Sequence, residues 1–328
     1  MHDFAYGRQR LDLLRWGLTV AEWDLDAGHA PNDSLARAIA TAATAAWSQG
    51  RLAEAATHAA HAVALAGGAA SPGAASARRV GAHLALFAGR TDEAVTHYRD
   101  LAASLGAAGQ HARALICEFC AAQALAYGGR TAEATALVNS RLDAAVATGN
   151  PSTTSWAHFV TGLVTEPTDP DRAVCAYAEA IKHGELADCR LFVTLARSSA
   201  AALAARLNAT PTALASFAEV LELWAQLGNE ALQWWVLVRL VSPLAALGTD
   251  HDAAVLAGAV LAAADHRPVM PGETAQLETA LRLIRQRLGT AATSDAVAAG
   301  AGMDLAAAVA HAQRLIDSTG HRTPAVTS

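Results

Sequence analysis

Alanine-rich apolar stretches alternate along the chain with short polar turns, and the turns recur in one form. Three of them place a Gly-Arg pair before a glutamate and an alanine, at Gly50–Ala55, Gly89–Ala94 and Gly129–Ala134. Three weaker copies keep the spacing, at Asp169–Ala173, Thr210–Ala213 and Gly248–Ala253. Their last alanines stand at positions 55, 94, 134, 173, 213 and 253, so the interval between turns is nearly constant. Recurrence with a period of about 40 residues predicts an array of helical repeats.

Each turn is typical of the end of one helix and the start of the next. Glycine suits the left-handed conformation at a helix C-terminus, and proline suits the first turn of a helix. The turn residues of these two kinds are Gly50, Gly89, Gly129 and Gly248, and Pro170 and Pro211. A second set of breaks is expected at 67–73, 106–110, 149–151, 183–184 and 228–229. We therefore predict twelve helices in six antiparallel pairs.

Residue size on either side of each turn predicts how the helices pack. Nine residues after the turn the side chain is mostly large, at Ala59, Tyr98, Val138, Tyr177, Phe217 and Ala257. Seven residues before it the side chain is mostly small, at Ala43, Ala82, Ala122, Thr161, Ala201 and Val241. Large side chains opposite small ones let helices interlock at about 8–10 Å between axes. Stacked pairs then share one continuous core, which predicts a curved solenoid.

Composition and charge narrow the class of protein. The chain has 328 residues, of which 53% are hydrophobic and 16% charged, so it is not expected to be disordered. A net charge of −6 and a single lysine, Lys182, provide no strongly basic face, and we expect no direct nucleic-acid partner. The start lacks a signal-peptide pattern, and the longest apolar run, Ala253–Ala264, is too short to cross a membrane. We expect a cytoplasmic protein with no membrane partner.

The repeat resembles the tetratricopeptide repeat in its turn glycine, its alanine five residues on, its aromatic nine on and its small residue seven before. Its period is longer than the length usual for that family, which is about 34 residues. The segments Gly149–Ser152, Asp169–Ala173 and Leu223–Trp235 further resemble the C-terminal repeat region of actinobacterial multidomain transcriptional regulators of the cyclase, ATPase and LuxR types. The segment from Pro271 to Val309 is similar to the closing helices of such regions.

This resemblance implies an all-α, right-handed solenoid. It comprises an N-terminal helix in 1–30, six tetratricopeptide-like hairpins over 31–266, two C-terminal capping helices in 267–318 and a polar tail at 319–328. The implied function is a non-catalytic sensor or scaffold that binds a protein or peptide in bacterial signalling. The sequence contains no phosphate-binding loop and no helix-turn-helix after Ile316, so we expect a sensor or scaffold without its effector.

In tetratricopeptide solenoids the first helix of each pair lines the concave groove. The positions thirteen, ten, six, three and two residues before each turn fit one helical face. This rule predicts groove residues Arg37, Trp47, Arg79, His83, Phe87, Phe119, Gln123, Tyr127, His158, Arg206 and Trp235, with Thr44, Ser76, Ser155, Glu166, Ser198 and Ser242. Aromatic and arginine side chains are common binding anchors, which favours a peptide or protein segment as partner. Alternatively, Trp47, Phe87 and Phe119 simply fill the inner wall.

Two adjacent tryptophans suggest a second possible role. Trp234 and Trp235 diverge by about 100° on a helix, so we expect one in the core and the other exposed. The alternative is that both are core. An exposed tryptophan could form a homodimer interface, which would make the chain a homo-oligomerisation scaffold.

Other reactive residues do not form a convincing chemical motif. Cys117 and Cys120 share one helical face but have no second pair, so buried free thiols are favoured over zinc or redox chemistry. His58 and His61 are expected on a solvated surface. Ser155 and His158 have helical spacing, and no acidic residue follows locally to orient the imidazole. We expect no enzyme activity, no cofactor and no metal.

Overall fold

The computed structural model describes residues 32–66, 71–208, 210–264 and 271–320, together with 16–17, 19 and 22–23. Over these ranges the fold is all-helical, with fifteen helices numbered α3 to α17 and no strand. The chain divides into two compact units, residues 1–196 and 197–328. The helix expected in 1–30 lies outside the described residues except for five helical positions, as does the tail beyond 320.

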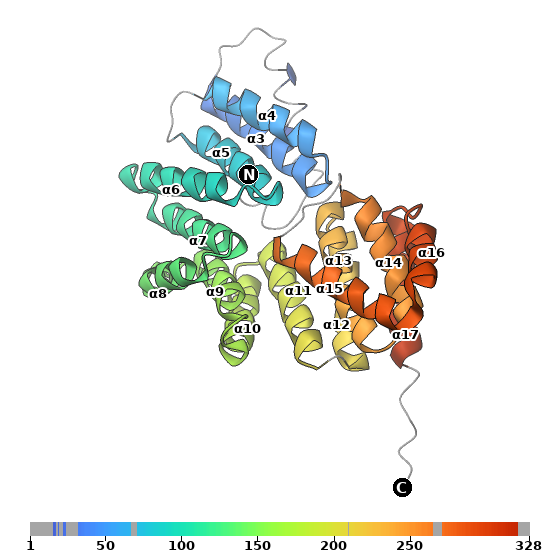
Figure 1. Cartoon of the computed structure of the whole chain (residues 1–328). Helices are drawn as coiled ribbons and strands as arrows, with labels where there is room; N and C mark the ends of the chain where they lie inside the picture. Colours follow the sequence, from blue (N-terminus) through green and yellow to red (C-terminus); the bar gives the residue numbers. More distant parts are fainter. Residues whose placement is uncertain are drawn as a thin grey trace. The chain divides into compact units, whose positions relative to one another are not determined.

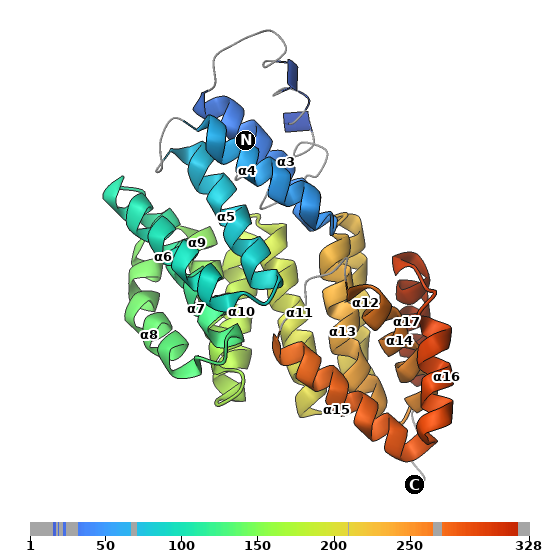
Figure 2. The same ribbon diagram turned by 45° about the horizontal axis from the view of Figure 1, so that its top comes forward.

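Consecutive helices pack against each other throughout the first unit. Its helices are α3 (Asp33–Ser48), α4 (Leu52–Leu65), α5 (Pro72–Phe87), α6 (Thr91–Ala107), α7 (His111–Tyr127), α8 (Thr131–Ala147), α9 (Pro151–Thr165), α10 (Pro170–Leu186) and the start of α11 (Arg190–Leu207). Each helix from α3 to α9 contacts the next, α3 also contacts α5, and α7 also contacts α9. Figures 1 and 2 show these helices in chain order, from blue to yellow-green.

The repeated turns have one geometry, which confirms the prediction of a left-handed glycine at the helix end. Gly50, Gly89, Gly129 and Gly248 all have φ between 72° and 77°. The amide of the residue after the glycine closes the preceding helix, as when Arg90 N donates to Ala85 O at 2.9 Å. This hydrogen bond spans five residues and is that of a Schellman motif.

In the three Gly-Arg turns, the arginine pairs with the glutamate three residues on. Arg90 Nε lies 2.7 Å from Glu93 Oε2, and Arg130 is 2.7 Å from Glu133. Arg51 and Glu54 form the same pair. The glutamate lies in the first turn of the new helix, where the helix dipole favours a negative charge.

The predicted packing positions are all in the core. Every residue nine after a turn or seven before it is buried, from Tyr98 and Ala82, both fully inaccessible, to Ala59 at 6% exposure. The alanine at the end of each turn is also buried. Small side chains therefore allow the close approach of neighbouring helices, as the sequence predicts.

One predicted break is wrong. The sequence places a turn at His183–Gly184, but α10 continues to Leu186 and the chain turns at Asp188, whose φ is 48°. Gly184 is buried inside the helix, and an added Cβ would lie 2.8 Å from Val193 Cγ2. This glycine is needed for the close packing of α10 against the start of α11, and not for a turn.

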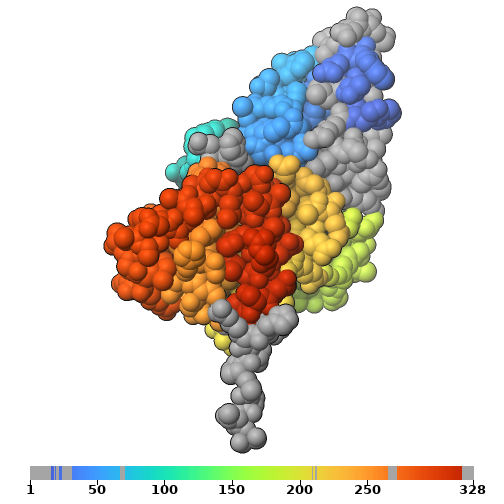
Figure 3. Space-filling view, turned by 90° about the vertical axis from the view of Figure 1, so that its right-hand side faces the viewer, coloured from blue at the N-terminus to red at the C-terminus, as the bar shows by residue number. Residues whose placement is uncertain are grey.

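The second unit surrounds one helix with others. Its complete helices are α12 (Pro211–Gln226), α13 (Glu230–Ala246), α14 (Asp250–Ala262), α15 (Pro271–Leu288), α16 (Thr290–Gly300) and α17 (Leu305–Gly320). Helix α13 contacts α12, α14, α15 and α17 and is buried along most of its length. Three helices, α15 to α17, lie within 271–320, where two capping helices were expected. Figure 3 shows the side of this unit on which α14 to α17 are coloured orange to red.

Helices α14 and α16 cross at two glycines. A Cβ added at Gly258 would lie 2.0 Å from the Val297 carbonyl oxygen. One added at Gly300 would lie 1.8 Å from the Val255 carbonyl oxygen. The two backbones are therefore in direct contact, and each crossing position requires glycine.

Across the described residues, no helix combines the length and apolar character needed to cross a bilayer.

Candidate functional site

A cavity of about 210 Å³ lies among four first helices of the pairs in the first unit. We call it the first-turn cavity, because most of its wall comes from the starts of α7, α9 and α11. Its lining residues are Arg79 and His83 of α5, Ala112, Arg113, Ile116 and Cys120 of α7, Asn150, Ser152, Thr153 and Trp156 at the start of α9, and Cys189 and Phe192 at the start of α11.

Local sequence explains why the first turn of α9 lies here. Asn150 is the N-cap, and its side-chain oxygen accepts hydrogen bonds from the amides of Ser152 at 3.0 Å and Thr153 at 3.4 Å. Pro151 occupies the first helical position, where its missing N–H costs nothing. The helix start thus fixes Thr153 and Trp156 on the cavity wall. Helix N-termini also carry partial positive charge.

The charge of the cavity wall is positive. Arg79 and Arg113 both line the cavity, and no aspartate or glutamate is among its lining residues. A smaller adjoining cavity of about 30 Å³ shares Arg79, Arg113 and Ile116. The site is therefore cationic in a chain whose net charge is −6.

Two buried polar groups of the wall have no hydrogen-bond partner. These are the hydroxyl of Thr153, on a residue with no exposed surface, and the indole N–H of Trp156, on a residue 6% exposed. The Trp156 ring packs against Phe159 and Phe192, with ring centroids 5.1 and 5.0 Å apart. A buried polar group without a partner costs about 1–3 kcal/mol, so such groups are uncommon in native proteins.

His83 supplies a neutral ring to the same wall. Burial, and secondly the charge of Arg79, lower the pKa of His83 to about 3. Its Nδ1 is hydrogen-bonded to the hydroxyl of Tyr98 on α6. The imidazole is thus uncharged at neutral pH, and the positive charge of the cavity comes from the arginines.

Three aromatic residues predicted for the groove, Trp47, Phe87 and Phe119, do not line the first-turn cavity. Trp47 stacks on Phe87 with ring centroids 5.2 Å apart and an interplanar angle of 17°. Phe119 is 1% exposed and lies in the core. Trp47 and Phe119 are thus buried, as the alternative of wall-filling rings expects, and Phe87 is half-buried. The indole N–H of Trp47 is also buried without a partner, but Trp47 does not line the first-turn cavity.

The other predicted groove residues of α3 to α7 lie away from the first-turn cavity, apart from Arg79 and His83. Gln123 donates to the Tyr127 hydroxyl at 3.4 Å, near the C-terminal end of α7. Thr44 is buried and bonds to a carbonyl of its own helix, and Arg37 is half-buried on α3. Ser76 lines the smaller adjoining cavity.

The predicted residues of α9 and its C-cap face α10. Ser155 donates to the Ala180 carbonyl at 2.7 Å, and Glu166 accepts from the Tyr177 hydroxyl at 2.7 Å. The His158 ring stacks on His183 with centroids 5.9 Å apart. Ser155 and His158 therefore each interact with α10 and not with each other.

The predicted residues of the second unit are scattered. Arg206 is exposed, Ser198 accepts from the Trp224 indole at 3.1 Å, and Ser242 donates to a carbonyl of α15 at 3.4 Å. Trp234 and Trp235 are 7% and 3% exposed. The expectation that one of these tryptophans is exposed is wrong, because α13 is enclosed by its neighbours.

Spacing from the turn did not identify Arg113, Thr153, Trp156 or Phe192 as site residues. The rule counts back from the C-terminal end of each first helix, whereas these four residues belong to helix starts. The signal that could have found Thr153 and Trp156 is Asn150-Pro151, a cap and first-turn pair that locates the start of α9.

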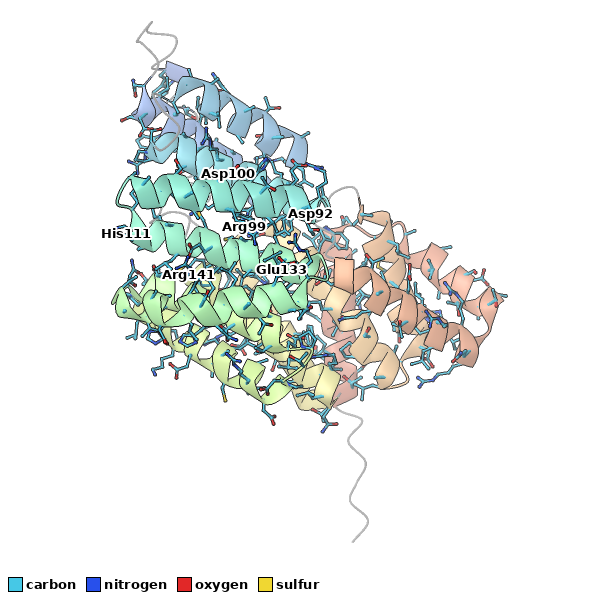
Figure 4. All side chains as sticks on the ribbon, turned by 60° about the vertical axis from the view of Figure 1, so that its left-hand side comes forward. Asp92, Arg99, Asp100, His111, Glu133 and Arg141 are labelled. Atoms are coloured by element: carbon cyan, nitrogen blue, oxygen red, sulfur yellow. The ribbon has the colours of Figure 1, made fainter. Side chains whose placement is uncertain are left out.

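The outer surface of the first unit differs from the cavity in charge. Arg130 pairs with Asp92 at 3.0 Å and with Glu133 at 2.7 Å, and Arg141 pairs with Glu118 at 2.9 Å. Figure 4 labels the acidic and basic side chains Asp92, Arg99, Asp100, His111, Glu133 and Arg141 on α6, α7 and α8. A hollow of about 710 Å³ among α4, α5 and α6 likewise has lining residues of both signs.

None of the four cysteines, all within the described residues, forms a disulfide. Cys117, Cys120 and Cys189 are buried, and Cys175 is exposed. Burial raises the pKa of the Cys117 thiol to about 11 and raises that of Cys120 further. The nearby Trp156 indole slightly opposes the rise at Cys120, but its N–H does not have the geometry of a hydrogen bond to the sulfur.

The histidine pair of α4 was expected on a solvated surface. His58 is half-buried beside Glu54, and His61 is exposed. Within the described ranges, no cluster of three or more His, Cys, Asp or Glu side chains is arranged to hold a metal ion.

Comparison with known proteins does not assign the chain to a family. No protein-family model matches the sequence, and no curated protein matches it. Its function is therefore inferred from its fold and from the first-turn cavity.

Proposed function

We propose that this chain is a non-catalytic interaction module, a right-handed tetratricopeptide-like solenoid of six hairpins that acts as a sensor or scaffold in a bacterial cytoplasmic regulator. The regular recurrence of the turns and the resemblance to the repeat region of actinobacterial multidomain regulators support this proposal. The paired helices and the common turn geometry agree with it.

The first-turn cavity is the observation that carries the proposal. It lies on the first helices of the pairs, the elements that bind partners in tetratricopeptide solenoids. Its wall combines two arginines, apolar rings and two buried polar groups that have no partner. Wall groups of this kind serve recognition, because a bound molecule can satisfy them.

The side chains of the cavity are suited to binding better than to catalysis. The Cys120 thiol has a raised pKa and stays protonated at neutral pH, so it is a poor nucleophile. The neutral His83 ring is bonded to Tyr98 and not to a nucleophile. A ligand would act by changing the angle between stacked pairs, since small shifts add along an array of repeats.

Retention of partners from native extract tests this function. The tagged chain is compared with an Arg79→Gln/Arg113→Gln variant and with Arg78→Gln, which changes the exposed neighbour of Arg79 on α5. A protein or small molecule retained by the wild type and by Arg78→Gln, but lost from the double variant, is the expected result. Equal retention by all three would place the site elsewhere.

The alternative function is a homo-oligomerisation scaffold that pairs through exposed apolar patches, for which Trp234 or Trp235 was one candidate. Both side chains are buried, so neither provides that interface. Light scattering over a range of concentrations separates the two functions. A concentration-independent monomer mass is expected for the sensor, and a mass that doubles with concentration would support the scaffold.

A further inference from the structure

The unpartnered groups of the first-turn cavity specify the polar part of its ligand. The indole N–H of Trp156 can only donate a hydrogen bond, and the Thr153 hydroxyl can also donate one. Both lie on one face of α9, three residues apart, and line one cavity. The missing group is therefore an acceptor with room for two hydrogen bonds, as a carboxylate has.

The charged groups around the cavity favour a negative acceptor. Helix α5 contributes Arg79 and the neutral His83, and α7 contributes Arg113 and the protonated thiols of Cys117 and Cys120. The nearest acid on α7, Glu118, is paired with Arg141 of α8. The first turns of α7, α9 and α11 add the positive ends of three helices. An anion gains from all of these, whereas a cation is repelled.

The rest of the wall and its size limit the body of the ligand. Ile116, Phe192 and the Trp156 ring are apolar, and the two rings are 5.0 Å apart at their centroids. A volume of about 210 Å³ is below the 300–1,000 Å³ that is usual for drug-sized ligands. The cavity accepts one small ring and excludes a folded peptide of several residues.

We infer that the first-turn cavity binds a small organic carboxylate with a planar apolar body. The carboxylate accepts from Thr153 and Trp156 beside Arg79 and Arg113, and the body packs on Phe192 and Ile116. This inference rests on the proposed function, since it names the ligand class that the sensor would detect.

Paired probes test the inference on the full chain. Benzoate and indole-3-acetate carry the carboxylate and the ring, their amides benzamide and indole-3-acetamide lack the charge, and acetate lacks the ring. Binding is followed by the ¹⁵N–¹H signal of the Trp156 indole, assigned with Trp156→Phe, and by calorimetry. The aromatic carboxylates are expected to shift this signal and to bind at least tenfold more tightly than the amides or acetate.

Substitutions then locate the binding energy. Arg79→Gln and Arg113→Gln are each expected to weaken aromatic carboxylate binding about tenfold or more, and Thr153→Val by a smaller factor. Arg78→Gln is the matched control, because Arg78 lines the other hollow between α4 and α6 and should leave affinity unchanged. Circular dichroism of every variant checks that the fold is kept.

The outcomes separate this inference from the proposed function. Equal binding of carboxylates and amides, or no binding of any carboxylate by the folded wild type, would overturn the ligand class. Retention of a macromolecular partner that depends on Arg79 and Arg113 would then leave the proposed function standing. Binding of a peptide through its C-terminal carboxylate, with free aromatic acids inactive, would also overturn the inference and favour a protein partner. Carboxylate binding that no cavity variant weakens would overturn the site.

Discussion

The two units of the chain use the same period and enclose their helices to different extents. In the first unit the pairs follow one another, and a cavity remains among the starts of the first helices. In the second unit α15 and α17 add to α12 and α14 around α13, whose side chains are almost all buried. The repeat therefore determines which helices pair. The additional helices α15 and α17 determine whether the first helix of a pair is enclosed.

The two units also differ in what packs against particular glycines inside their helices. In the first unit an added Cβ at Gly162 would meet the Tyr177 ring at 2.6 Å, so a side chain lies against glycine. In the second unit Gly258 and Gly300 each meet a backbone carbonyl of the opposite helix. A ring can rotate away from an added methyl group, but a helix backbone cannot shift without its neighbours. The crossing glycines Gly258 and Gly300 therefore tolerate an added methyl group less than Gly162 does.

The largest effect is expected from a methyl group at the α14–α16 crossing. Gly258→Ala or Gly300→Ala should lower the free energy of unfolding by about 3 kcal/mol or more, because the Cβ overlaps a carbonyl oxygen. Urea denaturation measures the loss. Gly272→Ala in α15 is the control, since no atom lies within 4 Å of its added Cβ and alanine favours a helix. Equal losses in crossing and control variants would refute the close contact.

Thiol labelling shows whether the damage stays in the second unit. All four cysteines lie in the first unit, so their reactivity reports on that unit alone. In the wild type the exposed Cys175 should react quickly and the three buried thiols only on unfolding. The same pattern is expected in Gly258→Ala. Rapid labelling of four thiols in that variant would mean that the units unfold together.

Truncation of matched core leucines sharpens the comparison with a smaller effect. Leu237 of α13 is 0% exposed and Leu86 of α5 is 1% exposed. Leu237→Ala should cost about 3 kcal/mol and Leu86→Ala about 2 kcal/mol, because a helix enclosed on all sides cannot collapse into the cavity left behind. Denaturant unfolding at constant slope measures both losses. A greater loss for Leu86→Ala would reverse the ranking of the two units.

Acid is expected to destabilise the first unit through His83. The pKa of this group is about 3 in the folded chain and about 6.5 when unfolded, so the unfolded state binds more protons between these values. Its contribution to stability is complete above pH 6.5 and decreases as the pH falls toward 3. The expected loss at pH 5, relative to pH 8, is about 2 kcal/mol. The lowered pKa of His158, caused first by burial, acts in the same direction.

Denaturation curves at several pH values check this prediction. His83→Gln should flatten the decrease below pH 6.5, since glutamine does not titrate. His251→Gln, at an exposed position of the second unit, is the matched control and should leave the decrease unchanged. An identical pH dependence in His83→Gln and the wild type would show that His83 is not the source.

The helices and their turns could be predicted from the sequence because their causes are local and recur at a nearly constant interval. A turn glycine, a cap and a buried alanine each act within one or two turns of helix. Gly184 resembles a turn residue by the same local rule, but its role is to admit Val193 of another helix. The enclosure of Trp234 and Trp235 likewise depends on helices far along the chain, which no local pattern specifies.

The site could be predicted only in part, for a geometric reason. Arg79 and His83 lie near the middle of α5, where counting back from the turn still works. Trp156 and Phe192 lie at helix starts, and the helices vary in length, with 15 residues in α9 and 18 in α11. Counting back from the turn at the C-terminal end of each helix therefore does not locate the residues at its start.

The smallest effect compares two hydroxyls on one helix. Ser155 and Thr153 both have 0% exposure, but only the Ser155 hydroxyl has a partner, the Ala180 carbonyl at 2.7 Å. Ser155→Ala should cost about 1 kcal/mol through the lost hydrogen bond. Thr153→Val should cost nothing or stabilise by up to about 1 kcal/mol, because valine keeps the shape and removes an unsatisfied group.

The sign of the Thr153→Val effect bears directly on the cavity. A stabilising or neutral result, measured by thermal and urea unfolding without ligand, means that the chain keeps a hydroxyl that lowers its own stability. Such a group is explained by a bound molecule that satisfies it. A loss equal to that of Ser155→Ala would mean that the hydroxyl is already satisfied in the free chain, and the cavity would then lack one of the two donors assigned to its ligand.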